Sequence, residues 1–211
     1  MPEPLIKICG LSTPETVDAA VAAGATHIGL NLYPPSPRYV TAEKAAALRA
    51  RIPQRVKVVL LLVNEQPQPT ALAIQAVRPD VVQFHGSETP EWLALLRQNT
   101  PLEIWKAIGV QDAASLERAQ RYKDAAHRLL YDAPAKKLPG GTGLTFDWSL
   151  LTSFQHTMPW GLAGGLTPET VAEAIRQTGA ELVDTSSGVE SAPGVKDVDK
   201  IAAFCQAARS V

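Results

Sequence analysis

The pentapeptide Thr13-Pro14-Glu15-Thr16-Val17 returns unchanged as Thr167-Pro168-Glu169-Thr170-Val171, and each copy is followed by a Gly-Ala pair, at 24–25 and 179–180. Two shorter segments begin in a similar way, namely Thr41-Ala42-Glu43 and Thr89-Pro90-Glu91. A threonine hydroxyl accepts hydrogen bonds from the first free amides of a helix, proline fits the first helical turn, and glutamate suits the positive end of the helix dipole. Each of these motifs therefore predicts a helix start, and the glycines predict helix ends.

Short apolar runs lie between these helix starts and suit buried parallel strands. We expect strands at Leu5–Cys9, His27–Leu32, Lys57–Val63, Val81–Phe84, Ile104–Ile108, Arg128–Tyr131, Pro159–Ala163 and Leu182–Asp184. We expect helices near residues 14–23, 41–50, 69–77, 90–99, 112–123, 147–154, 168–178 and 197–209. Eight alternating strand–helix units predict an α/β fold, a single-domain (β/α)8 TIM barrel over residues 1–211. A doubly wound open sheet is the alternative, and it is disfavoured because no Gly-x-Gly-x-x-Gly follows the first strand.

The composition excludes several classes of protein. Of 211 residues, 45% are hydrophobic and 19% are charged, which is typical of a globular chain rather than a disordered or collagen-like one. The net charge of −1 provides no broad positive field, so we expect neither nucleic acid nor a membrane as a partner. The longest apolar run, Val58–Val63, is too short to span a bilayer, and the first residues do not resemble a signal peptide. We therefore expect a soluble, cytoplasmic protein.

The two cysteines, Cys9 and Cys205, lie at opposite ends of the chain. Neither has a second cysteine or a histidine at the spacing that zinc sites use, so the sequence predicts reduced thiols and no metal site.

Glycine and serine follow the last two predicted strands and predict a phosphate site. Gly164 and Gly165 would let a ligand approach the backbone after strand seven, while Ser186, Ser187 and Gly188 could open a short helical turn after strand eight. Backbone N–H groups at a helix start suffice to bind a phosphate, and the loops after these two strands are a frequent phosphate site in such barrels. Turn glycines and solvated serines are the alternative interpretation.

Cys9 and Asp132 form the candidate acid–base pair at the ends of strands one and six. Cys9 lies two residues after Lys7, on the same side of the strand, and a nearby cation favours the thiolate, which can accept a proton. Partial burial of Asp132 is expected to raise its pKa and keep a proton available. The alternatives are a buried, inert thiol and a structural carboxylate.

Three further features lie at the same end of the predicted barrel. Arg38 follows Pro37 in a constrained loop, where its planar guanidinium could bind a carboxylate with two hydrogen bonds. His85 could bind a substrate hydroxyl or hold its own loop. Residues 140–143, Gly-Gly-Thr-Gly, lack the lysine of a phosphate-binding P-loop, and they predict a flexible lid.

Taken in order, several segments resemble the phosphoribosylanthranilate isomerase family of tryptophan biosynthesis, and the resemblance extends from Lys7 to Asp197. The segments are Lys7-Ile8-Cys9-Gly10, Ser36-Pro37-Arg38-Tyr39-Val40, Val82-Gln83-Phe84-His85-Gly86, Phe146-Asp147-Trp148 with the glycines of 140–143, Leu162-Ala163-Gly164-Gly165-Leu166, and residues 183–197. The cysteine motif and the run from Ser186 to Asp197 are the most specific. Two positions depart from the family pattern: Leu32 stands where phenylalanine is commoner, and Leu144 where a polar residue is commoner.

The resemblance implies a barrel that rearranges N-(5-phosphoribosyl)anthranilate to an open-chain amino-ketone. It implies Asp132 as general acid, Cys9 as general base, and Arg38 as the residue that binds the anthranilate carboxylate. His85 would face the sugar, and Asp184 would face the sugar hydroxyls or orient the acid–base pair. The glycines and serines after strands seven and eight would bind the phosphate. No cofactor is expected. A barrel isomerase for another phosphorylated sugar and a non-catalytic phospho-sugar-binding barrel remain alternatives, and the chain could be a monomer or a homodimer.

Overall fold

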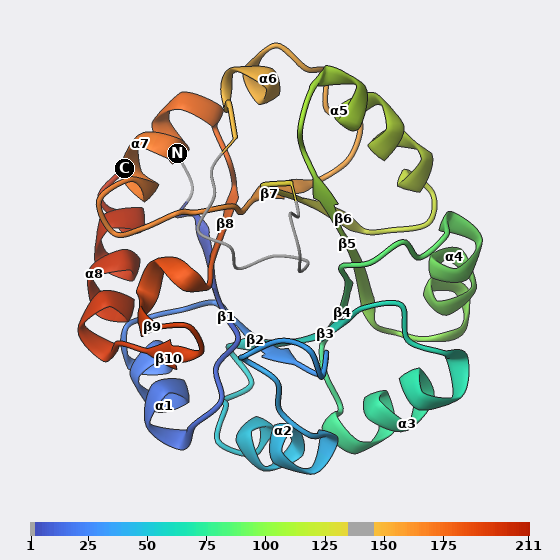
Figure 1. Cartoon of the computed structure of the whole chain (residues 1–211), viewed down its shortest axis with the longest axis vertical. Helices are drawn as coiled ribbons and strands as arrows, with labels where there is room; N and C mark the ends of the chain where they lie inside the picture. The colour runs from blue at the N-terminus through green and yellow to red at the C-terminus, as the bar shows by residue number, and fades with distance from the viewer. Residues whose placement is uncertain (1–2, 135–145) are drawn as a thin grey trace.

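A closed barrel of eight parallel strands forms the centre of the computed structural model, which describes residues 3–134 and 146–211. The strands follow one another in chain order, and the first pairs with the last, with Lys7 opposite Asp184. Figure 1 shows the helices as an outer ring around these strands. The predicted barrel is therefore confirmed, and the open-sheet alternative is wrong.

The elements alternate as the sequence predicts. The strands are β1 (Leu5–Cys9), β2 (His27–Asn31), β3 (Lys57–Leu62), β4 (Val81–Phe84), β5 (Glu103–Gly109), β6 (Arg128–Asp132), β7 (Trp160–Leu162) and β8 (Leu182–Thr185). The helices are α1 (Pro14–Ala22), α2 (Ala42–Arg49), α3 (Pro67–Val77), α4 (Pro90–Asn99), α5 (Ala113–Ala119) with the 3-10 helix η1 (Gln120–Tyr122), α6 (Ser149–Thr152), α7 (Val171–Thr178) and α8 (Val198–Arg209). None of the helices in the described ranges is long and apolar enough to cross a membrane.

Buried apolar side chains form two separate clusters because neighbouring residues of a strand point to opposite faces. One cluster contains only residues of strands and strand ends, and it fills the inside of the barrel: Val59, Val81, Trp105, Ala107, Leu130, Ala163 and Leu182. The larger cluster joins the outer faces of the strands to the helices, where Val17 of α1 and Phe204 of α8 are fully buried. The barrel interior is thus packed with apolar side chains below its open end.

The four motifs that begin with threonine stand at helix starts in two different geometries. Thr13, Thr41 and Thr89 each accept a hydrogen bond from the amide three residues later, as predicted. The second pentapeptide differs, because the amide of Thr167 donates to the hydroxyl of Thr170 and α7 begins only at Val171. The helix start predicted at 168 is therefore wrong by three residues, although Gly179 ends α7 in the left-handed region as expected.

Two other segments differ from the predicted elements. The helix expected near 147–154 is the four-residue α6. After β8, the predicted helical turn is the three-residue 3-10 helix η2 (Ser187–Val189), and it leads into an unpredicted antiparallel hairpin of β9 (Glu190–Ala192) and β10 (Val195–Lys196). This hairpin brings two charged residues, Glu190 and Lys196, next to each other at the top of the barrel.

The repeated pentapeptide allows a matched test of helix capping. Replacing Thr13 with alanine should lower the free energy of unfolding by about 1 kcal/mol, because the amide of Thr16 loses its acceptor. Thr167→Ala should cost less, since its hydroxyl accepts from no helix amide. Equilibrium urea unfolding followed by circular dichroism measures both, and equal losses would contradict the two geometries.

Candidate active site at the open end of the barrel

One pocket at the carboxyl ends of the strands brings together all ten site residues predicted from the sequence. They are Cys9, Arg38, His85, Asp132, Gly164, Gly165, Asp184, Ser186, Ser187 and Gly188. These residues come from six strand–loop units, so only barrel closure places them in one cavity. The open end is also where barrels of this type carry their functional residues.

Cys9 lies beside a buried ion pair. Lys7 Nζ donates to Asp184 Oδ1 at 2.9 Å, and both side chains are buried. Burial alone lowers the pKa of Lys7, but the Asp184 carboxylate raises it above its ordinary value, so Lys7 stays charged. Gly29 on β2 leaves room for the thiol, because a Cβ there would lie 2.8 Å from Cys9 Sγ.

The charge of Lys7 favours the thiolate of Cys9, as expected, but burial opposes it more strongly. Burial raises the pKa of the Cys9 thiol, and the lowering by Lys7 does not overcome it. Lys7 is also paired with Asp184, whose negative charge adds to the rise in the thiol pKa. Cys9 is therefore a thiol at neutral pH while the pocket holds no substrate.

Asp132 ends β6 and is held by two contacts. Its Oδ1 accepts from the amide of Ala133 at 2.8 Å, and its Oδ2 lies 3.3 Å from Nε2 of His85. His85 follows β4, so the contact joins two strand ends on opposite sides of β5. The alternative in which His85 only holds its own loop is thereby weakened, because its ring also orients a carboxylate in the pocket.

The loops after β7 and β8 are packed against each other. Gly164 and Gly165 both have positive φ, and Thr185 donates to the carbonyl of Leu166 at 2.7 Å. Gly188 lies so near this loop that a Cβ there would be 1.9 Å from the same carbonyl oxygen. The two predicted phosphate-binding segments therefore form one surface, and their backbone is half-buried at the pocket wall.

The guanidinium of Arg38 does bind a carboxylate with two hydrogen bonds, but the carboxylate belongs to the protein. Its Nε and Nη2 donate to Oε1 and Oε2 of Glu190, each at 2.7 Å, and both side chains are buried. Asn31 and Ser36 hold the loop that carries Arg38, since Asn31 donates to the Ser36 hydroxyl and the amide of Arg38 donates to the same oxygen. The pocket thus receives a fixed guanidinium edge rather than a mobile side chain.

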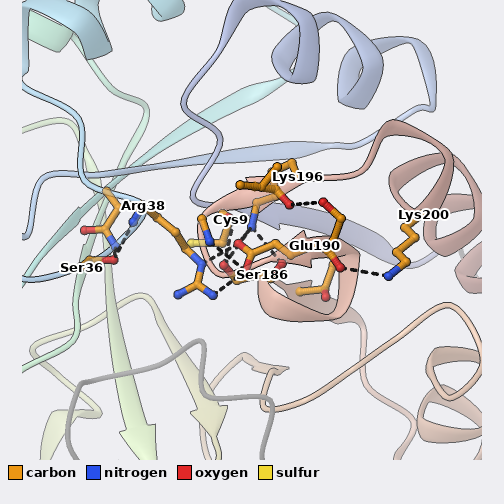
Figure 2. Close-up of polar contacts among 12 residues, drawn as sticks. Cys9, Ser36, Arg38, Ser186, Glu190, Lys196 and Lys200 are labelled. Atoms are coloured by element: carbon orange, nitrogen blue, oxygen red, sulfur yellow. Dashed lines mark hydrogen bonds and ion pairs between the residues drawn. The ribbon is translucent and has the colours of Figure 1, made fainter.

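Glu190 also links the Arg38 loop to the segment after β8 (Figure 2). Lys196 donates to Glu190 Oε1 at 2.6 Å and to the carbonyl of Ser186 at 2.8 Å, while Ser186 donates to the carbonyl of Cys9. Burial alone would raise the pKa of Glu190, but the hydrogen bond from Arg38 and the charge of Lys196 hold it below its ordinary value. Two cations and one anion leave this cluster with a local positive charge near the predicted phosphate loops.

Several residues of the site were not assigned by the sequence analysis. Asn31, Ser36, Gln83 and Thr185 line the pocket, and Glu190 and Lys196 support it. Gln83 was detectable as a polar residue inside an apolar strand, whereas the partners of Glu190 had no local signal. A buried pair, Glu88 and Lys106, also fixes the loop after His85, because Glu88 accepts from the amide of Gly86 and Lys106 donates to the carbonyl of Gly86.

The segment predicted to form a lid is not among the residues that the structure describes. Residues 140–143 and Leu144 lie outside the described residues. Leu32 is described, and it borders a neighbouring groove next to α2 and α3. Within residues 3–134 and 146–211, no group of three or more His, Cys, Asp or Glu side chains is placed to hold a metal ion.

Known proteins resemble this chain along nearly its whole length. A family model described as N-(5'-phosphoribosyl)anthranilate (PRA) isomerase matches residues 6–207. The N-(5'-phosphoribosyl)anthranilate isomerase of Erythrobacter litoralis is 66% identical over 206 residues, which cover 98% of this chain and 99% of that protein.

Solved structures show the same similarity. Monomers of the dimeric phosphoribosylanthranilate isomerase of Thermotoga maritima superpose with a TM-score of 0.85 at 34% identity, covering 99% of this chain and 100% of that one. A phosphoribosylanthranilate isomerase in complex with reduced 1-(o-carboxyphenylamino)-1-deoxyribulose 5-phosphate superposes with a TM-score of 0.86 at 33% identity and the same coverage.

The raised pKa of Cys9 can be measured by alkylation. In a Cys205→Ser protein, the rate of iodoacetamide labelling should keep rising as the pH passes about 9, because only the thiolate reacts and its pKa lies above the ordinary thiol range. Mass spectrometry follows the modification. The matched Cys9→Ser protein reports on Cys205, which is fully buried and should react more slowly. A labelling rate that levels off below about pH 8 would show a lowered thiol pKa instead.

Proposed function

Because this chain belongs to the phosphoribosylanthranilate isomerase family, and is an isomerase of tryptophan biosynthesis, we propose that Cys9 and Asp132 move the protons of its reaction. Substrate and product of this rearrangement are isomers, so protons change place while no electron or group is transferred to another molecule. The chemistry needs one acid, one base and a fixed substrate. The observation that supports the proposal is the gathering of both residues in one pocket with two regions suited to anions.

Asp132 acts first, as the general acid. It protonates the ring oxygen of the ribose, the bond from this oxygen to C1 breaks, and the nitrogen lone pair forms an iminium at C1. The contacts from Ala133 and His85 support this role, because they fix the orientation of the carboxyl group at the strand end. A positioned acid lowers the barrier because the proton moves without reorganising solvent.

Cys9 acts second, as the general base. Its sulfur removes the proton from C2, the electron pair forms the C1–C2 double bond, and the iminium nitrogen becomes neutral; the resulting enol then tautomerises to the amino-ketone. The thiol first releases its own proton to water, and two cations favour this: Lys7 beside the thiol and the iminium formed by ring opening. The substrate itself therefore helps to generate its base.

The two ends of the substrate are held by different physical means. Arg38 binds the anthranilate carboxylate, because its planar guanidinium lies at the pocket and suits a carboxylate. Gly164, Gly165, Ser186, Ser187 and Gly188 bind the phosphate through backbone N–H groups and hydroxyls, aided by the positive cluster around Lys196. His85 and Asp184 face the sugar between them.

The assembly and location are proposed from the same relationship. The Thermotoga maritima protein is dimeric. For this chain we propose either a homodimer or a monomer. A cytoplasmic location remains a prediction from the sequence.

The acid–base assignment predicts large losses of turnover without loss of binding. Cys9→Ser and Asp132→Asn should each reduce kcat by about 10²–10⁴-fold, because a positioned proton-transfer group contributes this much. Loss of substrate fluorescence, with phosphoribosylanthranilate made in situ, measures turnover, and calorimetry measures product binding. Cys205→Ser is the control and should retain full activity. Near-normal turnover of Cys9→Ser would make Cys9 a structural residue.

The two anion sites predict different ligand losses. Arg38→Ala should weaken product binding by about 10- to 150-fold, since a charge-assisted contact contributes about 1.5–3 kcal/mol, and should weaken inhibition by ribose 5-phosphate far less. Arg38→Lys, which keeps a cation beside Glu190, separates loss of the guanidinium from loss of charge. Gly165→Val should abolish binding of both ligands, because it adds a branched side chain at a positive φ. If Arg38→Ala loses both ligands equally, Arg38 belongs to the phosphate site or to the fold.

A further inference from the structure

Gln83 is a polar residue in the middle of the barrel wall. It lies on β4 between Val82 and Phe84, opposite Leu61 of β3 and Trp105 of β5. Only 1% of its surface is exposed, and it lines the same pocket as Cys9 and Asp132. Strand alternation places it on the inner face together with Val81, which belongs to the interior cluster.

Both polar atoms of the Gln83 side chain lack a hydrogen-bond partner. Within the described part of the chain it is the only side chain that leaves two buried polar atoms unpaired. The other residues with an unpaired buried atom, Thr70, Trp92 and Trp148, do not line the pocket. Asn31 and Asp184, which do line it, are hydrogen-bonded. A buried amide without partners destabilises the free protein, so its position requires an explanation.

A ligand in the pocket would supply the missing partners. The carboxamide offers an N–H donor and a C=O acceptor side by side, which matches a sugar hydroxyl, itself a donor and an acceptor. It carries no charge, so it can contact the reacting part of the substrate without changing the charge balance around Cys9 and Asp132. The substrate needs such a group, because its carboxylate and phosphate have their own sites at either end.

We propose that Gln83 binds the sugar hydroxyls of the substrate and of the open-chain product, and that its unpaired state in the free protein is the cost of this contact. The proposal rests on substrate binding in this pocket, and it does not depend on which residues transfer the protons. It adds a neutral contact between the two anion sites and makes Gln83 a residue that distinguishes a sugar phosphate from phosphate alone.

Gln83→Met tests the proposal, since methionine has a similar length and volume and no hydrogen-bonding amide. The variant should unfold at the same temperature as the unaltered protein or about 2–4 °C higher, because an unpaired buried group is removed. Its affinity for the product, measured by calorimetry, should fall by about 10-fold, the effect of one lost hydrogen-bonding group. Its inhibition by inorganic phosphate should not change.

Two matched variants separate stability from binding. Thr70→Val removes another unpaired buried hydroxyl, on α3 and away from the pocket, so it should raise the unfolding temperature and leave product affinity unchanged. Leu61→Met alters the neighbouring pocket residue without removing a polar group, and it should change product affinity by less than about twofold.

The outcomes are distinct. A loss of product affinity at unchanged phosphate inhibition supports the contact. Product affinity within twofold of the unaltered protein overturns it, and so does an equal loss of product and phosphate, which would show an effect through the fold. If Gln83→Met does not fold, Gln83→Asn takes its place with both ligands, because it keeps the amide but withdraws it by one methylene group. Failure of the Cys9 and Asp132 variants to lose turnover would leave these binding results unaffected.

Discussion

The ion pair between Lys7 and Asp184 joins the first strand of the barrel to the last, across residues that are 177 positions apart in the chain. Both side chains are buried, and each would be costly there without the other; removing one partner of such a pair typically costs about 3–5 kcal/mol. Closure of the barrel at this register therefore fixes a polar centre inside an apolar wall. This arrangement also sets the environment of Cys9. Burial raises the pKa of its thiol, Lys7 lowers that pKa, and Asp184 raises it.

The charges of the site are local and mostly paired within the protein. A chain with a net charge of −1 has no general attraction for a substrate that carries a carboxylate and a phosphate, so recognition must come from a few fixed cations. Arg38 and Lys196 share one carboxylate, Glu190, and the hairpin that carries Glu190 follows directly from the segment after β8. The two regions proposed to bind the carboxylate and the phosphate are consequently joined by one hydrogen-bonded cluster, which would favour a substrate with both anions at a set separation.

Among the described residues that line the pocket, hydrogen bonding of buried side-chain nitrogen and oxygen atoms is incomplete at one point, the amide of Gln83. The rest of the barrel top uses buried polar groups that hold each other, as Glu88 and Lys106 do around the loop after His85. An enzyme that must bind a neutral sugar between two anionic ends needs donors and acceptors that are not already satisfied. Stability given up at such a position is a common feature of functional sites, since the group that binds substrate cannot also be fully bonded in its absence.

Local sequence was enough to predict the order and type of the helices and strands, and to predict that the site residues lie at the carboxyl ends of the strands. Apolar runs, threonine caps and glycines act within a few residues, so Leu5–Cys9 and Pro90–Asn99 could be located without knowing the rest of the chain. Three features depend on tertiary structure and could not be predicted from local sequence. They are the partner of Arg38, the raised pKa of Cys9 and the late start of α7. The reason is physical: Arg38 and Glu190 are 152 residues apart, and both their contact and the desolvation of a thiol arise from barrel closure, which no local pattern encodes.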